Sequence, residues 1–294
     1  MKQNMKKGII FALLSATLYA LNAPFSKLLL NFISPTLMAG FLYLGAGIGM
    51  IFIIIIRRAQ KTTKKESYLT KTELPYTIAM IALDIVAPIC LLLGLNTTTA
   101  TTASLLNNFE VVATAIIALV IFKEKISTRL WVSILFITSS CSILSIEDIS
   151  KLEFSYGSLF ILLATICWGL ENNCTRKISS KDPLQIVLLK GIFSGIGSII
   201  IGLYIGEKVF SFLNIIYVLI LGFIAYGLSI YFYVYAQRLL GATRTSAYYA
   251  FAPFISSVLS LIIFKTTPDY NYFIAFGLMI IGAWLAYQDK TPIS

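Results

Sequence analysis

Residues 35–56 read PTLMAGFLYLGAGIGMIFIIII and contain no charged side chain. A helix rises about 1.5 Å per residue, so a helix over this stretch spans about 33 Å, enough to cross the hydrocarbon core of a bilayer. A helix on the surface of a soluble protein would carry a charged or polar face, which this stretch lacks. The stretch therefore predicts a membrane-spanning helix.

Similar apolar runs recur along the whole chain of 294 residues, of which 58% are hydrophobic and 12% are charged. Soluble domains carry about 25% charged residues, so this composition excludes an ordinary soluble domain. Ten helices of about 20 residues would use about 200 residues, which leaves short loops and no room for a soluble domain. The ten expected spans are residues 8–30, 34–56, 74–95, 99–122, 130–146, 156–178, 184–206, 212–236, 243–264 and 271–288.

The basic residues lie mostly in alternate gaps between these runs. The N-terminal segment and the loops after the second, fourth, sixth and eighth runs hold most of them, and residues 57–71 form the largest cluster. The positive-inside rule assigns such loops to the cytoplasm, and an even number of spans then places both termini there. The net charge of +10 is thus a sign of topology, and we expect no nucleic-acid partner.

The residue types exclude several kinds of chemistry. The chain has no histidine, which rules out a histidine-based metal site, proton relay or catalytic triad. The spacing of the cysteines matches neither a metal site nor a disulfide framework, so we expect buried structural thiols. We therefore expect no metal, no cofactor and no enzymatic activity. The four cysteines, all within apolar runs, are Cys90, Cys141, Cys167 and Cys174.

The second half of the chain repeats the first. With a shift of 149 positions Gly8 meets Gly157, and with a shift of 148 the Gly-Ile-Gly at 47–49 meets the Gly-Ile-Gly at 195–197. Each half holds five expected helices, an odd number, so the second half must insert upside down relative to the first. Inverted repeats are a common plan of secondary transporters, with the binding site at the midplane between the halves. The two predicted units are residues 1–146 and 147–294.

A set of short motifs follows in the third and fourth runs, at Leu95, residues 101–106, Glu110-Val111 and Phe122-Lys123-Glu124. With the repeat, they resemble the EamA-type branch of the drug/metabolite transporter superfamily. Members often show Glu-Pro where this chain has Glu110-Val111, and the second half has Ala252-Pro253 at the matching place. The resemblance implies a ten-helix bundle with a central cavity, with the fifth and tenth helices peripheral. Relatives move amino acids, amines, drugs and other metabolites, commonly outward.

Three carboxylates fall inside the expected spans, at Asp84, Glu110 and Glu171. An acid at the centre of a membrane helix costs about 2.5–3.5 kcal/mol, so such residues persist where they pair, bind a solute or relay protons. Glu110, near the middle of its helix, is the leading candidate for a proton-coupled gate, and a structural hydrogen bond to a neighbouring helix is the alternative. Lys190 is expected either to pair with Glu171 or to reach the interface, and Lys27 to reach the interface.

Polar and aromatic side chains share stripes on otherwise aliphatic helices. Tyr19 and Asn22 lie on one face of the first helix, and their partners in the repeat are Trp168 and Glu171. Acids beside aromatic rings favour a cationic or zwitterionic solute, although core packing is the alternative for any single tyrosine. The predicted substrate-binding residues are Tyr19, Asn22, Asp84, Asn107, Glu110, Trp168, Glu171, Tyr226 and Tyr249.

Prolines and glycines suggest where the helices bend and touch. Pro24 predicts a bend near Asn22, and Pro88 predicts one near Asp84, because proline cannot donate a helical hydrogen bond. Small residues permit close contact between helices. The glycines that we expect to mediate such contact are Gly45, Gly47 and Gly49 with Gly191, Gly195 and Gly197.

These observations favour a secondary transporter that exports a small amino-acid-like, cationic or zwitterionic metabolite by alternating access, coupled to protons or to another gradient. The setting would be a bacterial inner membrane, and the protein a monomer or homodimer that contacts lipid and its small-molecule substrate. An exporter of drugs or other cationic compounds is the nearest alternative. A membrane scaffold without transport activity is the alternative from another class.

Overall fold

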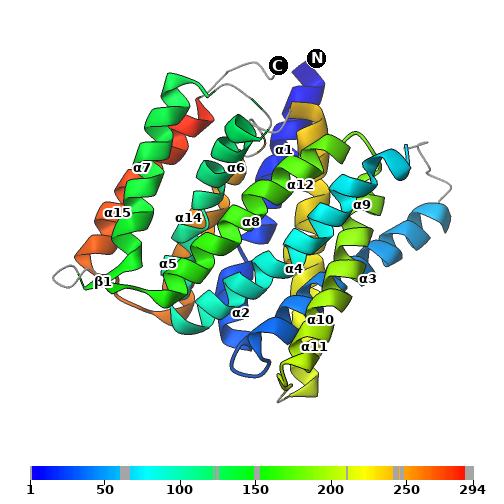
Figure 1. Cartoon of the computed structure of the whole chain (residues 1–294), viewed down its shortest axis with the longest axis horizontal. Helices are drawn as coiled ribbons and strands as arrows, with labels where there is room; N and C mark the ends of the chain where they lie inside the picture. The colour runs from blue at the N-terminus through cyan, green and yellow to red at the C-terminus, as the bar shows by residue number, and fades with distance from the viewer. Residues whose placement is uncertain are drawn as a thin grey trace.

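The computed structural model describes residues 2–59, 67–121, 123, 126–148, 153–209, 211–240, 245 and 248–288. Nearly all regular structure in this part of the chain is helical, and the helices lie side by side in one bundle (Figure 1). A short antiparallel pair of strands, β1 (Ile146–Asp148) and β2 (Glu153–Phe154), joins the two halves of the chain.

Each half contributes a similar series of helices. The first half forms α1 (Lys2–Tyr19), α2 (Asn22–Leu29), α3 (Pro35–Ala59), the 3₁₀ turn η1 (Lys71–Glu73), α4 (Leu74–Thr97), α5 (Ala100–Leu106), α6 (Phe109–Val120) and α7 (Thr128–Ser145). The second half forms α8 (Tyr156–Ile178), α9 (Pro183–Leu189), the π-helical segment η2 (Lys190–Ser194), α10 (Gly195–Tyr204), α11 (Phe212–Leu221), the π-helical segment η3 (Gly222–Leu228), α12 (Ser229–Leu240), α14 (Ala252–Phe264) and α15 (Tyr270–Tyr287).

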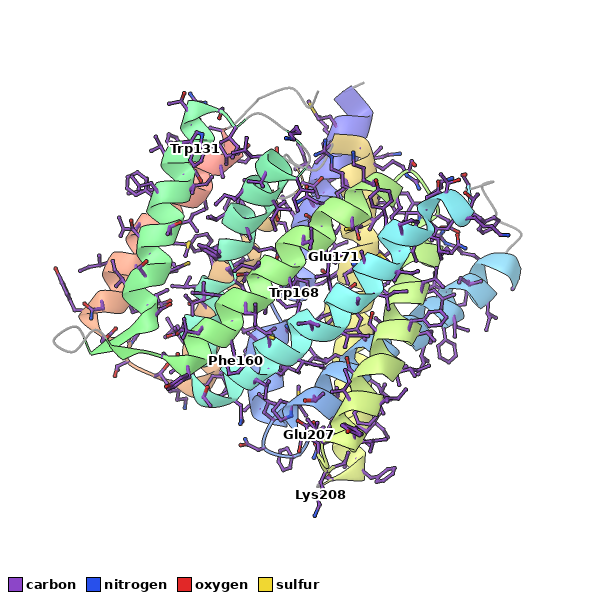
Figure 2. The ribbon with its side chains drawn as sticks, in the orientation of Figure 1. Trp131, Phe160, Trp168, Glu171, Glu207 and Lys208 are labelled. Atoms are coloured by element: carbon purple, nitrogen blue, oxygen red, sulfur yellow. The ribbon has the colours of Figure 1, made fainter. Side chains whose placement is uncertain are left out.

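The helices have the length and surface of membrane spans. Among the described residues, eight helical stretches are long and apolar enough to cross a bilayer, and α14 is a shorter apolar helix. Large apolar side chains are exposed on the outside of the bundle, including Trp131 and Phe160, which are labelled in Figure 2. The protein is therefore a multi-pass, α-helical membrane protein, as the sequence predicts. Helix α8 is continuous over 23 residues, but its polar side chains keep it outside these eight apolar stretches. The count of ten membrane crossings therefore stays a prediction.

Helices from the first part of the chain pack against helices from the second part, and the inverted repeat itself stays a prediction. The first turn of α1 and the last turn of α15 lie toward the same end of the bundle (Figure 1). Helix α4 packs along α8, and α1 packs along α12, so that each contact joins one half to the other. Helices α7 and α15 pack on each other at one edge of the bundle, where the family resemblance places the fifth and tenth helices (Figure 1).

Glycines allow the two halves to approach closely, as the sequence predicts. A Cβ atom on Gly45 would lie 2.1 Å from the carbonyl oxygen of Leu219, and one on Gly191 would lie 2.3 Å from the backbone nitrogen of Gly47. Both distances are far below van der Waals contact, so no larger residue fits without a shift of the backbone. Helix α3 thereby packs tightly against η2 and α11 of the other half.

Several helices are interrupted near their middle. The first predicted span breaks at residues 20–21, and Pro24 explains the break because it cannot donate a hydrogen bond to the carbonyl of Ala20. Helix α4 runs unbroken through Pro88, so this proline does not interrupt its helix, and the bend expected near Asp84 stays a prediction. The span expected over 99–122 is confirmed as one membrane-length stretch, Ala100–Val120, but Asn107 and Asn108 interrupt it and separate α5 from α6, which the sequence did not predict.

Candidate functional site

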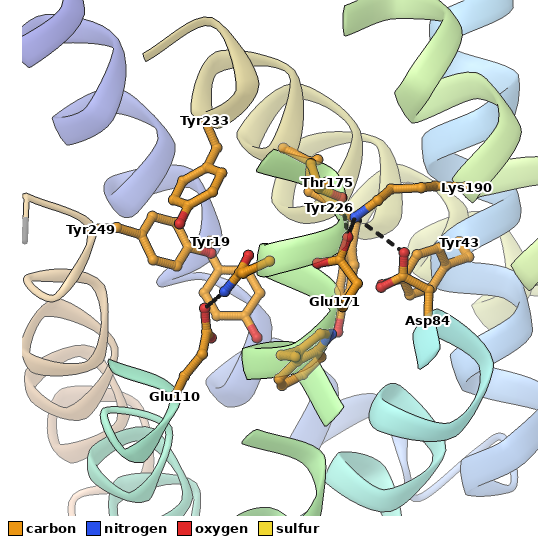
Figure 3. Close-up of a pocket in the computed structure, with 13 residues that line it drawn as sticks. Tyr19, Tyr43, Asp84, Glu110, Glu171, Thr175, Lys190, Tyr226, Tyr233 and Tyr249 are labelled. Carbon is orange, nitrogen blue, oxygen red and sulfur yellow. Dashed lines mark hydrogen bonds and ion pairs between the residues drawn. The ribbon is translucent and has the colours of Figure 1, made fainter. Parts of the chain in front are cut away.

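The interruptions in the helices meet around one cavity. Tyr19 ends α1, Glu110 lies in the first turn of α6, Lys190 begins η2, Tyr226 lies within η3, and Tyr249 lies just before α14. Helix breaks and π-helical turns concentrate at functional sites, and in membrane proteins irregular backbone lines cavities. The central cavity has a volume of about 50 Å³ (Figure 3). Its lining consists of Tyr19, Tyr43, Asp84, Glu110, Trp168, Glu171, Asn172, Thr175, Lys190, Tyr226, Ile230, Tyr233 and Tyr249.

A buried lysine joins two acids on one side of the central cavity. The Nζ atom of Lys190 lies 2.5 Å from Oε1 of Glu171 and 3.1 Å from Oδ2 of Asp84 (Figure 3). All three side chains are buried, so each charge depends on the others to offset its loss of hydration. Tyr43 donates a hydrogen bond of 2.7 Å to Asp84, and Thr175 donates one to Glu171. We call Asp84, Glu171 and Lys190 the Lys190 triad.

The structure decides between the alternatives for Lys190. Its side chain pairs with Glu171 rather than reaching the interface, and it also pairs with Asp84, which the sequence did not indicate. For Lys27, the expected place at the interface stays a prediction. Its Nζ atom donates to the backbone carbonyls of Leu95 (2.6 Å) and Thr98 (2.8 Å), at the end of α4. A cation is stabilised there by the negative end of the helix dipole.

Glu110 lies on the other side of the central cavity, apart from the Lys190 triad (Figure 3). Its Oε1 atom accepts a hydrogen bond of 2.6 Å from the side-chain amide of Asn172. Among the described residues, no lysine or arginine forms an ion pair with Glu110. With every group ionised, the four side chains carry three negative charges and one positive charge. The cavity is thus suited to attract a cation or to take up protons.

Aromatic rings separate Glu110 from the triad. The ring of Tyr19 lies 5.5 Å from Tyr249, 5.9 Å from Tyr226 and 6.3 Å from Trp168, measured between centroids. The ring centroid of Tyr226 lies 5.0 Å from that of Tyr43. These rings offer both hydrophobic surface and negative π-faces, which suit an organic cation.

The structure brings most of the predicted residues together. Asn22 lies behind the lining, where its amide donates a hydrogen bond of 3.0 Å to the hydroxyl of Tyr226. Asn107 lines a second, smaller cavity next to the first. The remaining seven line the central cavity, namely Tyr19, Asp84, Glu110, Trp168, Glu171, Tyr226 and Tyr249. Their role in binding stays a prediction.

Several lining residues were not among the predicted ones. Thr175 follows Glu171 by one helical turn, so its place beside that acid has a sequence signal. Tyr43 has none, because it lies in an apolar run between glycines and only the packing of α3 on α4 directs it to Asp84. Lys190 was expected only as a partner of Glu171, and Tyr233 only as a ring on the same helix face as Tyr226. The other lining residues without a prediction are Asn172 and Ile230.

The second cavity, here called the side cavity, has a volume of about 20 Å³ and lies between the α5–α6 break and the start of α14. It shares Tyr19, Glu110 and Tyr249 with the central cavity, so these three side chains form a common wall. Its other lining residues are Asn107, Asn108, Val111, Thr114, Ala250 and Pro253. In the part of the chain that the structure describes, no group of three or more Cys, Asp or Glu side chains is arranged to hold a metal ion.

Comparisons with known proteins agree with this architecture. A family model described as the EamA-like transporter family matches residues 6–146 and 155–288. A protein named "Uncharacterized transporter" from Methanothermobacter thermautotrophicus is 23% identical over 298 residues, which cover 96% of this chain and 86% of the relative. "Uncharacterized transporter YyaM" from Bacillus subtilis is 23% identical over 245 residues, covering 80% of this chain and 79% of the relative. A solved crystal structure covers 96% of each chain with a TM-score of 0.70 and 13% identity, which shows a shared fold.

Proposed function

The chain belongs to the EamA-like transporter family, and from this premise we propose that the central cavity is the solute site of a secondary transporter. Membership of this family suggests a non-enzymatic function. The observation that carries the proposal is the convergence of broken helices on one cavity that holds buried charges and aromatic rings. Discontinuous helices around a midplane site are the recurring plan of secondary transporters.

The topology that we propose has ten spans in two inverted repeats, residues 1–146 and 147–294. The two stretches that match the family model, 6–146 and 155–288, support this division. The contact of Gly157 with Gly94, and that of Gly8 with Leu240, also support it, because Gly8 and Gly157 are equivalent in the repeat. By the positive-inside rule both termini lie in the cytoplasm, and a bacterial inner membrane fits this arrangement.

The charges of the central cavity indicate its solute. The Lys190 triad uses its only lysine to balance two acids, which leaves Glu110 as the free anionic group toward a solute. An anionic solute would meet a site with excess negative charge, whereas an ammonium group would be attracted to Glu110 and the surrounding rings. The proposed solute is therefore a small cationic or zwitterionic metabolite.

The size of the cavity supports a mechanism of alternating access. A volume of about 50 Å³ holds about three or four water molecules, which is less than an organic metabolite needs. The structure therefore represents a narrow state, and the halves must separate at one end to admit solute. We propose that the protein exports its solute, and that protonation of Glu110 competes with the cationic group and couples transport to the proton gradient.

Export of drugs or other bulky cations is the second candidate, and the row of aromatic rings supports it. The hydrogen bonds that Asp84 and Glu171 accept from Tyr43 and Thr175 argue for a small solute instead, because a bulky one would have to break them. Competition between small amines and cationic dyes in a flux assay separates these two candidates.

The test of the proposed function is solute flux into proteoliposomes with a panel of amino acids, amines, nucleosides and cationic dyes. We expect saturable flux of a cationic or zwitterionic solute that a proton gradient accelerates. Glu110→Gln should keep the fold and abolish the acceleration, because a neutral amide side chain does not ionise near neutral pH. The matched control is Asp269→Asn, at an exposed acid that caps α15, where asparagine caps as well as aspartate; it should change neither the flux nor its acceleration by the proton gradient. Absence of flux for every solute would favour a scaffold.

A further inference from the structure

The two repeats differ in residue type at the side cavity. With the shift of 142 positions, Asn107 corresponds to Tyr249 and Asn108 to Ala250. Each half is interrupted at this place, after α5 in the first half and before α14 in the second. One wall of the cavity therefore carries two amides and the opposite wall is aromatic and apolar. A local departure from the repeat at a cavity marks a position with a specialised role.

The two amides are buried without hydrogen-bond partners. Asn108 is 1% exposed, and neither its Oδ1 nor its Nδ2 atom has a partner in the described structure. The Oδ1 atom of Asn107 is also unpaired. Buried polar groups without partners destabilise a fold, so such groups call for an explanation.

Helix capping does not provide that explanation. Asn108 occupies the N-cap position of α6, where an asparagine usually accepts a hydrogen bond from the backbone. In this structure its side chain makes no such capping bond. The amide is directed to the side cavity instead, and the backbone hydrogen bonds of the break are made without it.

We propose that Asn107 and Asn108 form a second subsite, which binds the hydroxyl group of a solute whose ammonium group lies against Glu110. A hydroxyl both donates and accepts a hydrogen bond, as an amide pair with free oxygen and nitrogen atoms requires. The shared wall of Glu110, Tyr19 and Tyr249 places the two subsites side by side, so one small molecule can occupy both. The solute class is thus a short amino alcohol. This inference rests on the proposed function and specifies its substrate.

The volume of the side cavity agrees with a group of this size. About 20 Å³ is enough for one water molecule, and a hydroxyl has nearly the same size and the same hydrogen-bonding capacity. A second ammonium group would be less suitable, because it cannot accept a hydrogen bond from the Nδ2 atom of Asn108. A methyl group would leave both amides unpaired.

The test compares 2-aminoethanol with propylamine, which has a methyl group in place of the hydroxyl. Dissociation constants are obtained from thermal-shift titrations of the detergent-purified full chain. We expect 2-aminoethanol to bind about fivefold more tightly, the contribution of one neutral hydrogen bond. In Asn108→Leu the preference should disappear, so that the two amines have about equal dissociation constants. The melting temperature of Asn108→Leu without solute should equal or exceed that of the unmodified protein, because an unpaired amide is removed.

The control is Asn173→Leu, at a buried amide that donates to the carbonyl oxygens of Gly169 (2.8 Å) and Thr114 (3.2 Å). It should lower the melting temperature and leave the preference for 2-aminoethanol unchanged. The inference is overturned if the unmodified protein does not prefer 2-aminoethanol, if it binds neither amine, or if Asn108→Leu retains the preference. It is also overturned if Asn108→Leu melts as early as Asn173→Leu, since Asn108 would then be structural.

Two further measurements keep the outcomes distinct. If Asn108→Leu does not fold, Asn108→Ala and Asn107→Ala are titrated with the same two amines, and an unchanged preference in both overturns the inference. The proposed function is judged separately, by flux of the whole solute panel. A protein that transports other solutes but does not distinguish the two amines would retain the proposed function and lose only this subsite.

Discussion

At the scale of single residues, the Lys190 triad is the most demanding feature of the structure. Taking one charge out of water costs several kcal/mol, so none of the three side chains is stable in this place without the others. Apolar residues of similar volume would often stabilise such a site more than ions do. Retention of the charges therefore suits a site in which partners exchange, for example when a solute or a proton enters beside Glu171.

Replacement of the lysine tests this dependence. Lys190→Met leaves Asp84 and Glu171 buried without a cation, and we expect the free energy of unfolding to fall by about 3 kcal/mol. The combined variant Lys190→Met, Asp84→Asn and Glu171→Gln should recover most of this loss, because no unpaired charge remains. Thermal unfolding in detergent compares the stability of both variants with that of the unmodified protein. A Lys190→Met variant as stable as the unmodified protein would show that the acids do not need their cation.

At the scale of elements, the sequence predicts the helices better than their interruptions. Long apolar runs are a strong signal, and Pro24 has a covalent reason to break its helix. The break at Asn107 and the π-helical turns at Lys190 and Tyr226 depend on packing, because asparagine is tolerated in helices and a π turn has no distinctive residue. The same limit applies to the site. The pairing of Lys190 with Asp84 depends on how two helices are rotated, which a single sequence does not fix.

Glycine contacts provide a prediction at this scale. Gly45→Ala on α3 would place a Cβ atom 2.1 Å from the backbone oxygen of Leu219, and we expect a loss of about 2 kcal/mol in unfolding free energy. The control is Gly277→Ala on α15, where nothing lies within 4 Å of the added atom. That change should be neutral or stabilise by up to about 1 kcal/mol, through helix propensity. Equal melting temperatures for the two variants would contradict the close packing of α3 on α11.

At the scale of the whole molecule, the two halves are bound to each other at both ends of the bundle as well as around the cavity. At one end Glu207 accepts hydrogen bonds from the backbone nitrogens of Thr36 (3.1 Å) and Leu37 (2.8 Å), and Figure 2 shows it far from the start of α1. Toward the other end Lys181 pairs with Glu73 at 3.2 Å. Both contacts join the first half to the second, so opening at one end can leave the contacts at the other intact. Such behaviour is what alternating access requires.

The proposed orientation can be tested at two exposed tyrosines. Tyr68 lies between α3 and α4, within the basic cluster at 57–71, and Tyr204 ends α10; they are 65% and 91% exposed. In a background without the four native cysteines, a membrane-impermeant maleimide should label Tyr204→Cys in intact cells and Tyr68→Cys only in inside-out vesicles. The positive-inside rule places the basic cluster in the cytoplasm, and α10 carries the chain to the opposite face. Labelling of Tyr68→Cys from outside would reverse the proposed orientation and place both termini outside the cell. Labelling of both from one side would contradict the inverted repeat itself, because the connections after α3 and after α10 are equivalent in the two halves and must lie on opposite faces.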